Sequence, residues 1–323
     1  MSNRTVGRNA MLFARRLEEL GYDANSVVTV GSFDGVHLAH QQILREVVAR
    51  ARNRSGRSVL VTFDPHPREV LRPETPVVYL SSPEERRDLI TPMGIDAMLV
   101  LPFTDEFSRL TSREFLERFL VQGTGLAEMV EGYNHHFGRN REGSAQSIQD
   151  LARECGFAAT TVPQRDVNGV PVSSSAIRDF LRDGDVESAA RFLGRPYGVT
   201  GIVIPGDRRG RSLGYPTANL APSFARKMIP RNGIYVVGVD VGDGQQRFGL
   251  ASIGVRPTFH PDGPRTIEVY VLEFDEDIYG RSITATFLLR LRDEEKFDSV
   301  DALIWQMDRD REHAVAFVAA RTR

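Results

Sequence analysis

The pattern of hydrophobic and polar positions changes near residue 195, and the change divides the chain in two. The first part contains five short apolar runs that we interpret as strands: 26–31, 58–63, 96–101, 126–130 and 157–162. The helix after the first run is marked by apolar residues at helical spacing: Ile43, Leu44, Val47, Val48 and Ala51. Ser82 and Thr111 each begin a capping sequence with a glutamate three residues later. Alternating strands and helices predict a parallel sheet with helices on both faces.

After Arg195-Pro196 the apolar runs follow one another with turn residues between them and little helical spacing. The predicted strands are 199–204, 233–241, 247–253, 266–274 and 282–291. This pattern favours an antiparallel sheet or a small β-barrel. An amphipathic helix closes the chain, with Asp298 or Ser299 as its cap. Its apolar stripe is Val300, Leu303, Ile304, Met307, Ala314, Val315 and Val318.

The predicted organisation is therefore an α/β domain over residues 1–193 and a β-barrel domain over residues 194–323. The length of 323 residues agrees with two domains, since single cores rarely grow so large. The formal net charge of −2 gives no general field for nucleic acid or anionic lipid, so we expect neither as a partner. No apolar run approaches the ~18 residues of a membrane span, and no signal peptide is apparent. We expect a cytoplasmic protein whose single cysteine, Cys155, is an inert core thiol.

The first candidate site is the segment from Gly31 to His40, Gly-Ser-Phe-Asp-Gly-Val-His-Leu-Ala-His. It follows the first predicted strand and enters a helix, which is where open parallel sheets bind ligands and where amide groups favour an anion. His37 and His40 are spaced to face one spot, where they could donate hydrogen bonds to a pyrophosphate leaving group. Two surface histidines, or a metal pair, are the alternatives.

Three further segments contain candidate residues, and those that follow the second and fourth strands belong to the same predicted sheet edge. Ser173, Ser174 and Ser175 precede a helix that carries Arg178, a pattern that is often only a helix cap. Asp64-Pro65-His66 follows the second strand, and the alternative to a binding role is a rigid turn. Asn134 follows the fourth strand and could orient an acceptor phosphate or a ribityl chain.

The second candidate site is a glycine-rich segment that ends in Thr217 and Asn219. Glycine amides approach phosphates closely and an arginine adds charge; these residues are Gly206, Gly210, Arg211 and Gly214. The Thr217 hydroxyl and the Asn219 carbonyl are hard oxygen donors suited to Mg²⁺. The spacing is not that of a Walker loop, because no Gly-Lys-Ser/Thr sequence follows.

Glu268 is the candidate general base of this second site. It lies on a predicted strand face with Tyr270, Leu272 and Phe274, where a carboxylate needs either a partner or a chemical role. A structural ion pair is the alternative. Phosphoryl transfer to an alcohol requires positioning, a metal ion and a group that accepts the hydroxyl proton, and Glu268 would accept it.

The Gly-x-Phe-Asp-Gly-x-His-x-x-His sequence resembles the signature of the nucleotidylyltransferase superfamily, with a Rossmann-like domain. The later Ser-Ser-Ser-Ala-Ile-Arg sequence is similar to the second motif of those enzymes. The resemblance implies that ATP is held by these residues: Gly31, Phe33, His37, His40, Ser173, Ser174, Ser175 and Arg178. The remaining loops resemble the flavin side of bacterial FAD synthetases, which implies flavin binding by Asp64, Pro65, His66 and Asn134.

The second half resembles riboflavin kinase from Gly194 onward, with Pro216-Thr-Ala-Asn219 and the downstream Glu268 as the most specific residues. In that family Gly206, Gly210, Arg211 and Gly214 would contact ATP and Glu268 the flavin. The whole chain is thus similar to the bifunctional riboflavin kinase/FAD synthetases, which implies Mg²⁺ as cofactor, ATP, riboflavin, FMN and FAD as substrates or products, and delivery of flavins to apoflavoproteins.

Three departures from the family pattern lie in the first half: Ala39, His135-His136 and Ser175. They leave open a monofunctional riboflavin kinase whose first domain has weak or altered adenylylation. A flavin-responsive binding protein without turnover is a rival of another class, which the retained reactive residues argue against.

Overall fold

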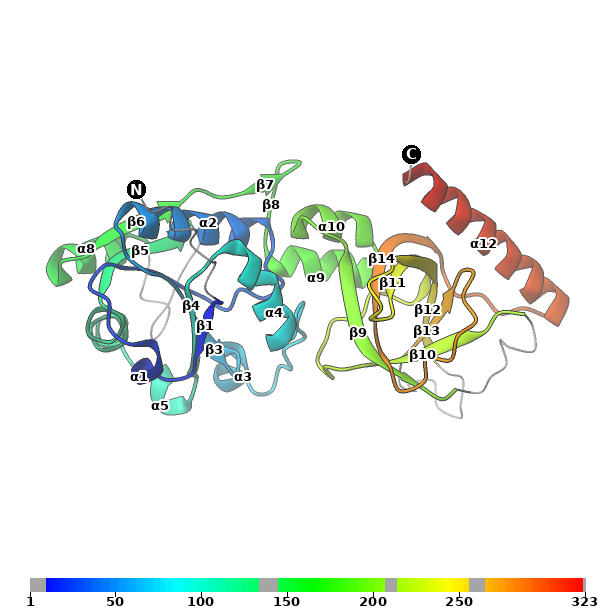
Figure 1. Cartoon of the computed structure of the whole chain (residues 1–323), viewed down its shortest axis with the longest axis horizontal. Coiled ribbons are helices and arrows are strands. Elements are labelled where there is room, and N and C mark those ends of the chain that lie inside the picture. The colour runs from blue at the N-terminus through cyan, green and yellow to red at the C-terminus, as the bar shows by residue number, and fades with distance from the viewer. Residues whose placement is uncertain (1–9, 134–144, 207–213, 256–264, 322–323) are drawn as a thin grey trace, which may run out of the picture. The chain divides into compact units, whose positions relative to one another are not determined.

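The computed structural model describes residues 10–133, 145–206, 214–255 and 265–321. Contacts between residues divide the chain into two compact units, Met1–Ser174 and Ser175–Arg323. Figure 1 shows a helix-flanked sheet in the first unit and a small barrel with a long final helix in the second. The expected sequence of an α/β fold followed by an antiparallel barrel is confirmed.

Six parallel strands form the sheet of the first unit, in the order β1-β4-β3-β2-β5-β6. The strands are β1 (Leu12–Ala14), β2 (Ser26–Val30), β3 (Ser58–Asp64), β4 (Ala97–Pro102), β5 (Leu126–Gly132) and β6 (Ala158–Val162). Strand order reverses at β2, which pairs with β3 on one side and β5 on the other. The carboxyl end of β2 therefore lies at the topological switch point, where sheets of this kind bind ligands.

Helices and short turns connect these strands. They are α1 (Leu17–Leu20), α2 (Leu38–Asn53), α3 (Pro67–Leu71), α4 (Pro83–Ile90), η1 (Thr91–Met93), α5 (Asp105–Ser108), α6 (Ser112–Phe115), η2 (Leu116–Val121, a π-helical turn), α7 (Gln122–Thr124) and α8 (Ala145–Cys155). The predicted capping boxes at Ser82 and Thr111 are both formed. A hairpin of β7 (Asp166–Val167) and β8 (Val170–Pro171) follows β6.

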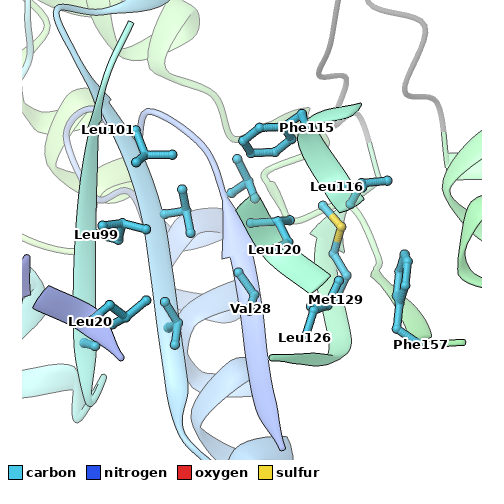
Figure 2. Close-up of a cluster of buried hydrophobic side chains, with 14 of the residues drawn as sticks. Leu20, Val28, Leu99, Leu101, Phe115, Leu116, Leu120, Leu126, Met129 and Phe157 are labelled. Carbon is cyan, nitrogen blue, oxygen red and sulfur yellow. The ribbon is translucent and has the colours of Figure 1, made fainter. Parts of the chain in front are cut away.

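The sheet has an apolar core on each face, because successive strand side chains point to opposite sides. Figure 2 shows one of them, in which Val28 and Leu99 from the strands pack against Phe115 and Leu120. The other core contains the α2 stripe: Leu44, Val47, Val48 and Ala51. Burial on both faces explains why the strand sequences are continuously apolar.

The second unit is a closed antiparallel barrel with the strand order β10-β13-β12-β11-β14-β9. Its strands are β9 (Tyr197–Ile204), β10 (Thr217–Pro222), β11 (Gly233–Asp240), β12 (Arg247–Val255), β13 (Arg265–Val271) and β14 (Ser282–Arg292). Two helices precede the barrel, α9 (Ser174–Asp183) and α10 (Val186–Leu193), and α10 packs against β9 and β14.

The final helix, α12 (Val300–Arg321), lies along the outer face of the barrel wall. Ser299 caps it by accepting a hydrogen bond from the Ala302 amide. The predicted apolar stripe is wrong at Val300 and Val315, which are 57% and 52% exposed, because the helix contacts the barrel along only part of its length. No helix among the described residues is long and apolar enough to cross a membrane.

Four strands were absent from the sequence prediction: β1, β7, β8 and β10. The first three are only two or three residues long, and β10 begins just after the glycine-rich segment, whose composition indicates a loop. Strand β13 ends at Val271, so Leu272 and Phe274 lie beyond it. Cys155 ends α8, half-buried rather than fully buried, and burial raises the pKa of its thiol. A raised thiol pKa agrees with an unreactive side chain.

Candidate active sites

The loop between β2 and α2 brings the two predicted histidines together. His37 is the N-cap of α2, and its Nδ1 accepts a hydrogen bond from the His40 amide at 3.3 Å. The two imidazole rings are stacked, with centroids 3.5 Å apart, and the Phe33 ring lies 4.8 Å from that of His40. A Cβ on Gly31 would approach the Phe33 ring at 3.0 Å, so the glycine leaves room for this aromatic side chain. The predicted convergence of the two histidines is therefore present at the start of the helix.

The backbone of this loop is held by the segment that precedes α4. Both oxygens of the buried Asp34 carboxylate accept the Leu80 amide at 3.0 Å, and one also accepts the Ser81 amide and hydroxyl. The Gly35 amide in turn donates to the Ser81 hydroxyl at 2.9 Å. Asp34 is part of the Gly31–His40 segment that the sequence singles out. The residues that bind its side chain are 46 or 47 positions away, and no local sequence pattern indicates them.

The two nucleotide motifs of the first half are connected directly. The Ser174 hydroxyl donates to the Asp34 carbonyl oxygen at 3.0 Å. Ser173 is half-buried beside it. Ser175 and Arg178 lie in the first turns of α9, which the residue contacts group with the second unit. Ser174 thus contacts the loop that carries His37, and the ATP-binding roles of all four residues stay predictions.

The predicted flavin-side loop begins at the carboxyl end of β3. Asp64 is exposed, and its peptide bond to Pro65 is cis. His66 is the N-cap of α3, where its Nδ1 accepts the Arg68 amide at 3.1 Å, and its ring meets the Tyr79 ring edge to face. His66 therefore has a structural role as a cap. Asn134 and His135-His136 lie outside the described residues.

Arg86 is a residue of this region that the sequence analysis missed. It lies on α4, is only 5% exposed, and donates from Nη1 to the Ser32 carbonyl oxygen at 2.7 Å. Burial lowers the pKa of its guanidinium, while the nearby Asp34 and Asp64 carboxylates oppose that shift. An arginine within a charged helix sequence is normally a surface residue, so nothing local distinguished Arg86 from its neighbour Arg87.

In the second unit, strand pairing brings together the predicted base, Glu268, and the two predicted metal ligands, Thr217 and Asn219. Thr217 begins β10, and Asn219 is the direct cross-strand partner of Glu268 on β13. The Thr217 hydroxyl donates to Glu268 Oε2 at 3.2 Å. Among the described residues Glu268 forms no ion pair, so its contact is a hydroxyl rather than a cation.

The glycine-rich segment contributes one close approach to this group. A Cβ on Gly206 would lie 2.0 Å from Asn219 Nδ2, so only glycine leaves space for that side chain. Gly214 lies in the turn just before β10. Gly210 and Arg211 lie outside the described residues.

Two cavities of the barrel share Thr217 as a lining residue. The first has a volume of about 260 Å³ and combines Glu268 with Tyr215, Tyr270 and residues of α12 such as Met307. The second, of about 350 Å³, is lined by Pro216, Ala218 and the segment from Phe274 to Tyr279. Glu268 faces only the first cavity.

The first cavity is closed on one side by α12, which two polar contacts attach to the barrel. The Arg292 guanidinium donates to both oxygens of the buried Asp310 carboxylate at 2.7–3.1 Å. Tyr215 donates a short hydrogen bond to Asp308, and burial together with that carboxylate raises the pKa of the tyrosine to about 12. Both interactions join residues that lie apart in the sequence, and together they hold α12 as one wall of the cavity.

The donors beside Glu268 fit a magnesium ion that is bound mainly by phosphate. Thr217 and Asn219 offer a hydroxyl and an amide oxygen, and the described residues contain no cluster of three or more His, Cys, Asp or Glu suited to a metal. Mg²⁺ commonly uses one or two protein oxygens and completes its shell with phosphate and water. Zinc, which favours nitrogen and sulfur, does not fit this set.

One unit places a helix N-terminus at the switch point of a parallel sheet, and the other places a carboxylate beside a hydroxyl and an amide on a barrel, features typical of proteins that bind phosphate groups. Residues 20–176 match the family model of FAD synthetase, and residues 193–318 match that of riboflavin kinase. A bifunctional riboflavin kinase/FMN adenylyltransferase from Pseudomonas fluorescens is 38% identical, covering 91% of this chain and 93% of that protein. The Escherichia coli protein of the same name is 34% identical, covering 88% and 90%.

A solved structure from Streptococcus pneumoniae, named a macrolide-efflux protein, has a TM-score of 0.84 and 32% identity. It covers 94% of this chain and 98% of its own. The printed name describes the Streptococcus pneumoniae protein. The likeness between the two structures supports the fold of this chain. From the two family models and the relatives, the chain belongs to the family of bifunctional riboflavin kinase/FMN adenylyltransferases.

Proposed function

We propose that the barrel phosphorylates riboflavin at Thr217, the residue shared by the two cavities described above. The two activities of the family are riboflavin kinase and FMN adenylyltransferase, which together produce FMN and FAD. The observation that carries the assignment of sites is that Thr217 lines both cavities while Glu268 faces one of them. The cavity with Glu268 and the aromatic side chains would hold the flavin, and the other would hold ATP.

In this proposal Glu268 accepts the proton of the ribityl 5′-hydroxyl as its oxygen attacks the γ-phosphorus and ADP departs. Thr217 orients the carboxylate through its hydrogen bond. Thr217 and Asn219 would hold Mg²⁺, which when bound neutralises charge on the phosphates. Because Gly206 has no side chain, the Asn219 side chain has room to lie beside Glu268.

The sheet unit carries out the second reaction in the same proposal. The FMN phosphate attacks the α-phosphorus of ATP, a new phosphoanhydride bond forms, and pyrophosphate leaves. The stacked His37 and His40 donate hydrogen bonds to the leaving group at the N-terminus of α2, where the helix amides add to the stabilisation. Gly31, Phe33, Ser174 and neighbouring residues form the ATP site.

The test is an assay of the whole chain with riboflavin and Mg-ATP, followed by chromatographic separation of the flavins. Thr217→Val is expected to reduce FMN formation at least tenfold, because it removes the hydroxyl shared by the two cavities. Thr200→Val is the matched control, since its hydroxyl pairs with that of Thr284 elsewhere on the barrel. Equal FMN formation by both variants would exclude Thr217 from the site, and no FMN from the wild-type chain would refute the function.

Location and partners follow from these reactions. A cytoplasmic protein that receives riboflavin and passes FMN and FAD to apoflavoproteins is the setting we propose. Chromatography also separates the rival possibilities. A riboflavin kinase with weak adenylylation would stop at FMN, and a binding protein without turnover would leave riboflavin unchanged.

A further inference from the structure

The loop that carries His37 has a backbone conformation that its sequence disfavours. Phe33 and Val36 have φ angles of 49° and 43°, in the left-handed region that residues with a Cβ rarely adopt. Both side chains are buried, at 2% and 1% exposure. Conformations of this kind persist only where surrounding contacts impose them. The loop therefore keeps this conformation only through its contacts with neighbouring segments.

Contacts from one neighbouring segment hold the loop on both sides of Phe33. On the far side, Asp34 and Gly35 bind Leu80 and Ser81. On the near side, the guanidinium of Arg86 holds the Ser32 carbonyl oxygen at 2.7 Å and lies 3.5 Å from the Thr62 hydroxyl. Arg86 thus supplies the polar contact to the backbone that enters the left-handed turn.

Burial of the charged Arg86 side chain costs more free energy than a purely structural role requires. Arg86 is 5% exposed, its Nε has no hydrogen-bond partner among the described residues, and the carboxylates that favour its charge are those of Asp34, Asp64 and Glu84. Buried charges usually contribute little net stability, and a well-packed apolar side chain often serves as well. A buried cation at the carboxyl edge of the sheet, under the histidine loop, therefore points to a geometric task.

We propose that Arg86 is a positioning residue for adenylyl transfer: by holding the Ser32 carbonyl it sets the loop that aims His37 and His40 at the leaving pyrophosphate. Arg86 acts through the loop backbone, since its own side chain is almost fully enclosed. The inference rests on the proposed FMN adenylyltransferase function of the sheet unit.

The experiment uses the full chain and compares Arg86→Met and Arg86→Lys with Arg87→Met. Arg87 is the adjacent residue on α4, with 48% of its side chain exposed, and serves as the matched control. Misplacement of reacting groups by about 1 Å can cost ~10²-fold in rate. We expect Arg86→Met to lower kcat for FAD formation from FMN roughly 10–100-fold with KM for FMN changed less than threefold.

Lysine keeps the charge and one donor but lacks the planar fork of arginine. Arg86→Lys should therefore recover much of the loss, with kcat about three- to tenfold below wild type. Riboflavin phosphorylation by the same preparations, and all activities of Arg87→Met, should stay within twofold of wild type. This separation of kcat from KM, with rescue by lysine, is not expected of a residue that only stabilises the fold.

Three results would overturn the inference. One is a loss of riboflavin phosphorylation in Arg86→Lys equal to its loss of FAD formation, which decides the matter even if Arg86→Met fails to fold. Another is an Arg86→Met variant that folds and keeps its kcat. The third is an equal loss in the lysine and methionine variants together with a lower melting temperature in both, which indicates a role in folding alone. A wild-type chain that makes FMN but no FAD would refute the proposed adenylylation, and this inference with it.

Discussion

Replacing Glu268 by glutamine tests the proposed base with little disturbance of its surroundings. Glutamine has nearly the same volume and keeps a carbonyl oxygen that can accept the Thr217 hydroxyl, now 3.2 Å from Glu268 Oε2. Glu268 forms no ion pair among the described residues, so the substitution leaves none of their cations without a partner. Thermal stability should therefore change little.

The expected loss is in the rate of phosphoryl transfer. A positioned general base contributes typically 10²–10⁴-fold, which corresponds to about 2.7–5.4 kcal/mol in the activation free energy. Replacing the charged acceptor by a neutral one weakens the hydrogen bond from Thr217 by about 1 kcal/mol at most. We therefore expect Glu268→Gln to form FMN at least 10²-fold more slowly, with FAD formation from supplied FMN within a few-fold of wild type.

The assay follows flavins by chromatography with Mg-ATP across a range of pH, and Glu312→Gln on the exposed side of α12 is the control. An unchanged rate of FMN formation at every pH would mean that Glu268 is a structural carboxylate. Loss of both reactions with a lower melting temperature would instead indicate a folding defect. Binding of riboflavin by the folded variant, measured by quenching of flavin fluorescence, separates a lost base from a lost site.

Three further outcomes are expected. His40→Ala should slow FAD formation by about 10²-fold or more while phosphorylation of riboflavin persists, and unchanged FAD synthesis would remove the imidazole from the mechanism. A fragment of residues 194–323 should fold and make FMN, but it should melt at a lower temperature than a fragment of residues 175–323. The reason is that α10 packs on the barrel, and each large side chain buried there contributes roughly 1.5–3 kcal/mol to the free energy of unfolding. Circular dichroism and FMN production check both expectations. Asp310→Asn should raise KM for riboflavin more than KM for ATP and lower the melting temperature, since it leaves Arg292 without its buried carboxylate.

Most of the fold was predictable because each half has a dominant periodicity. The central strands of the sheet are buried on both faces and appear as continuous apolar runs, and the barrel strands alternate. The failures occurred where local composition and tertiary environment conflict. Strand β10 begins after a glycine-rich segment, whose composition indicates a loop rather than a strand. Val300 and Val315 fit a helical stripe, but the barrel covers only part of α12.

The candidate residues were found where their chemistry is local in the sequence. His37 and His40 are three positions apart on one helix turn, so their approach could be predicted from helix geometry alone. Arg86 could not be found in this way. Its partner Ser32 is 54 residues away, and its burial depends on how α4 lies over the sheet edge. A single sequence holds no signal for such a contact.

The two units also differ in how they can present groups to phosphate. A parallel sheet places a helix N-terminus at its carboxyl edge, so amides and adjacent histidines are available from one continuous segment. At the barrel site the groups come from neighbouring strands instead, and Thr217, Asn219 and Glu268 must meet across the β10–β13 pairing. A one-residue slip of that register would turn Glu268 to the opposite face of the strand, away from Thr217. The kinase site is therefore more sensitive to strand register than the adenylylation site, and substitutions that disturb the β10–β13 pairing should lower FMN formation before they lower FAD formation from supplied FMN.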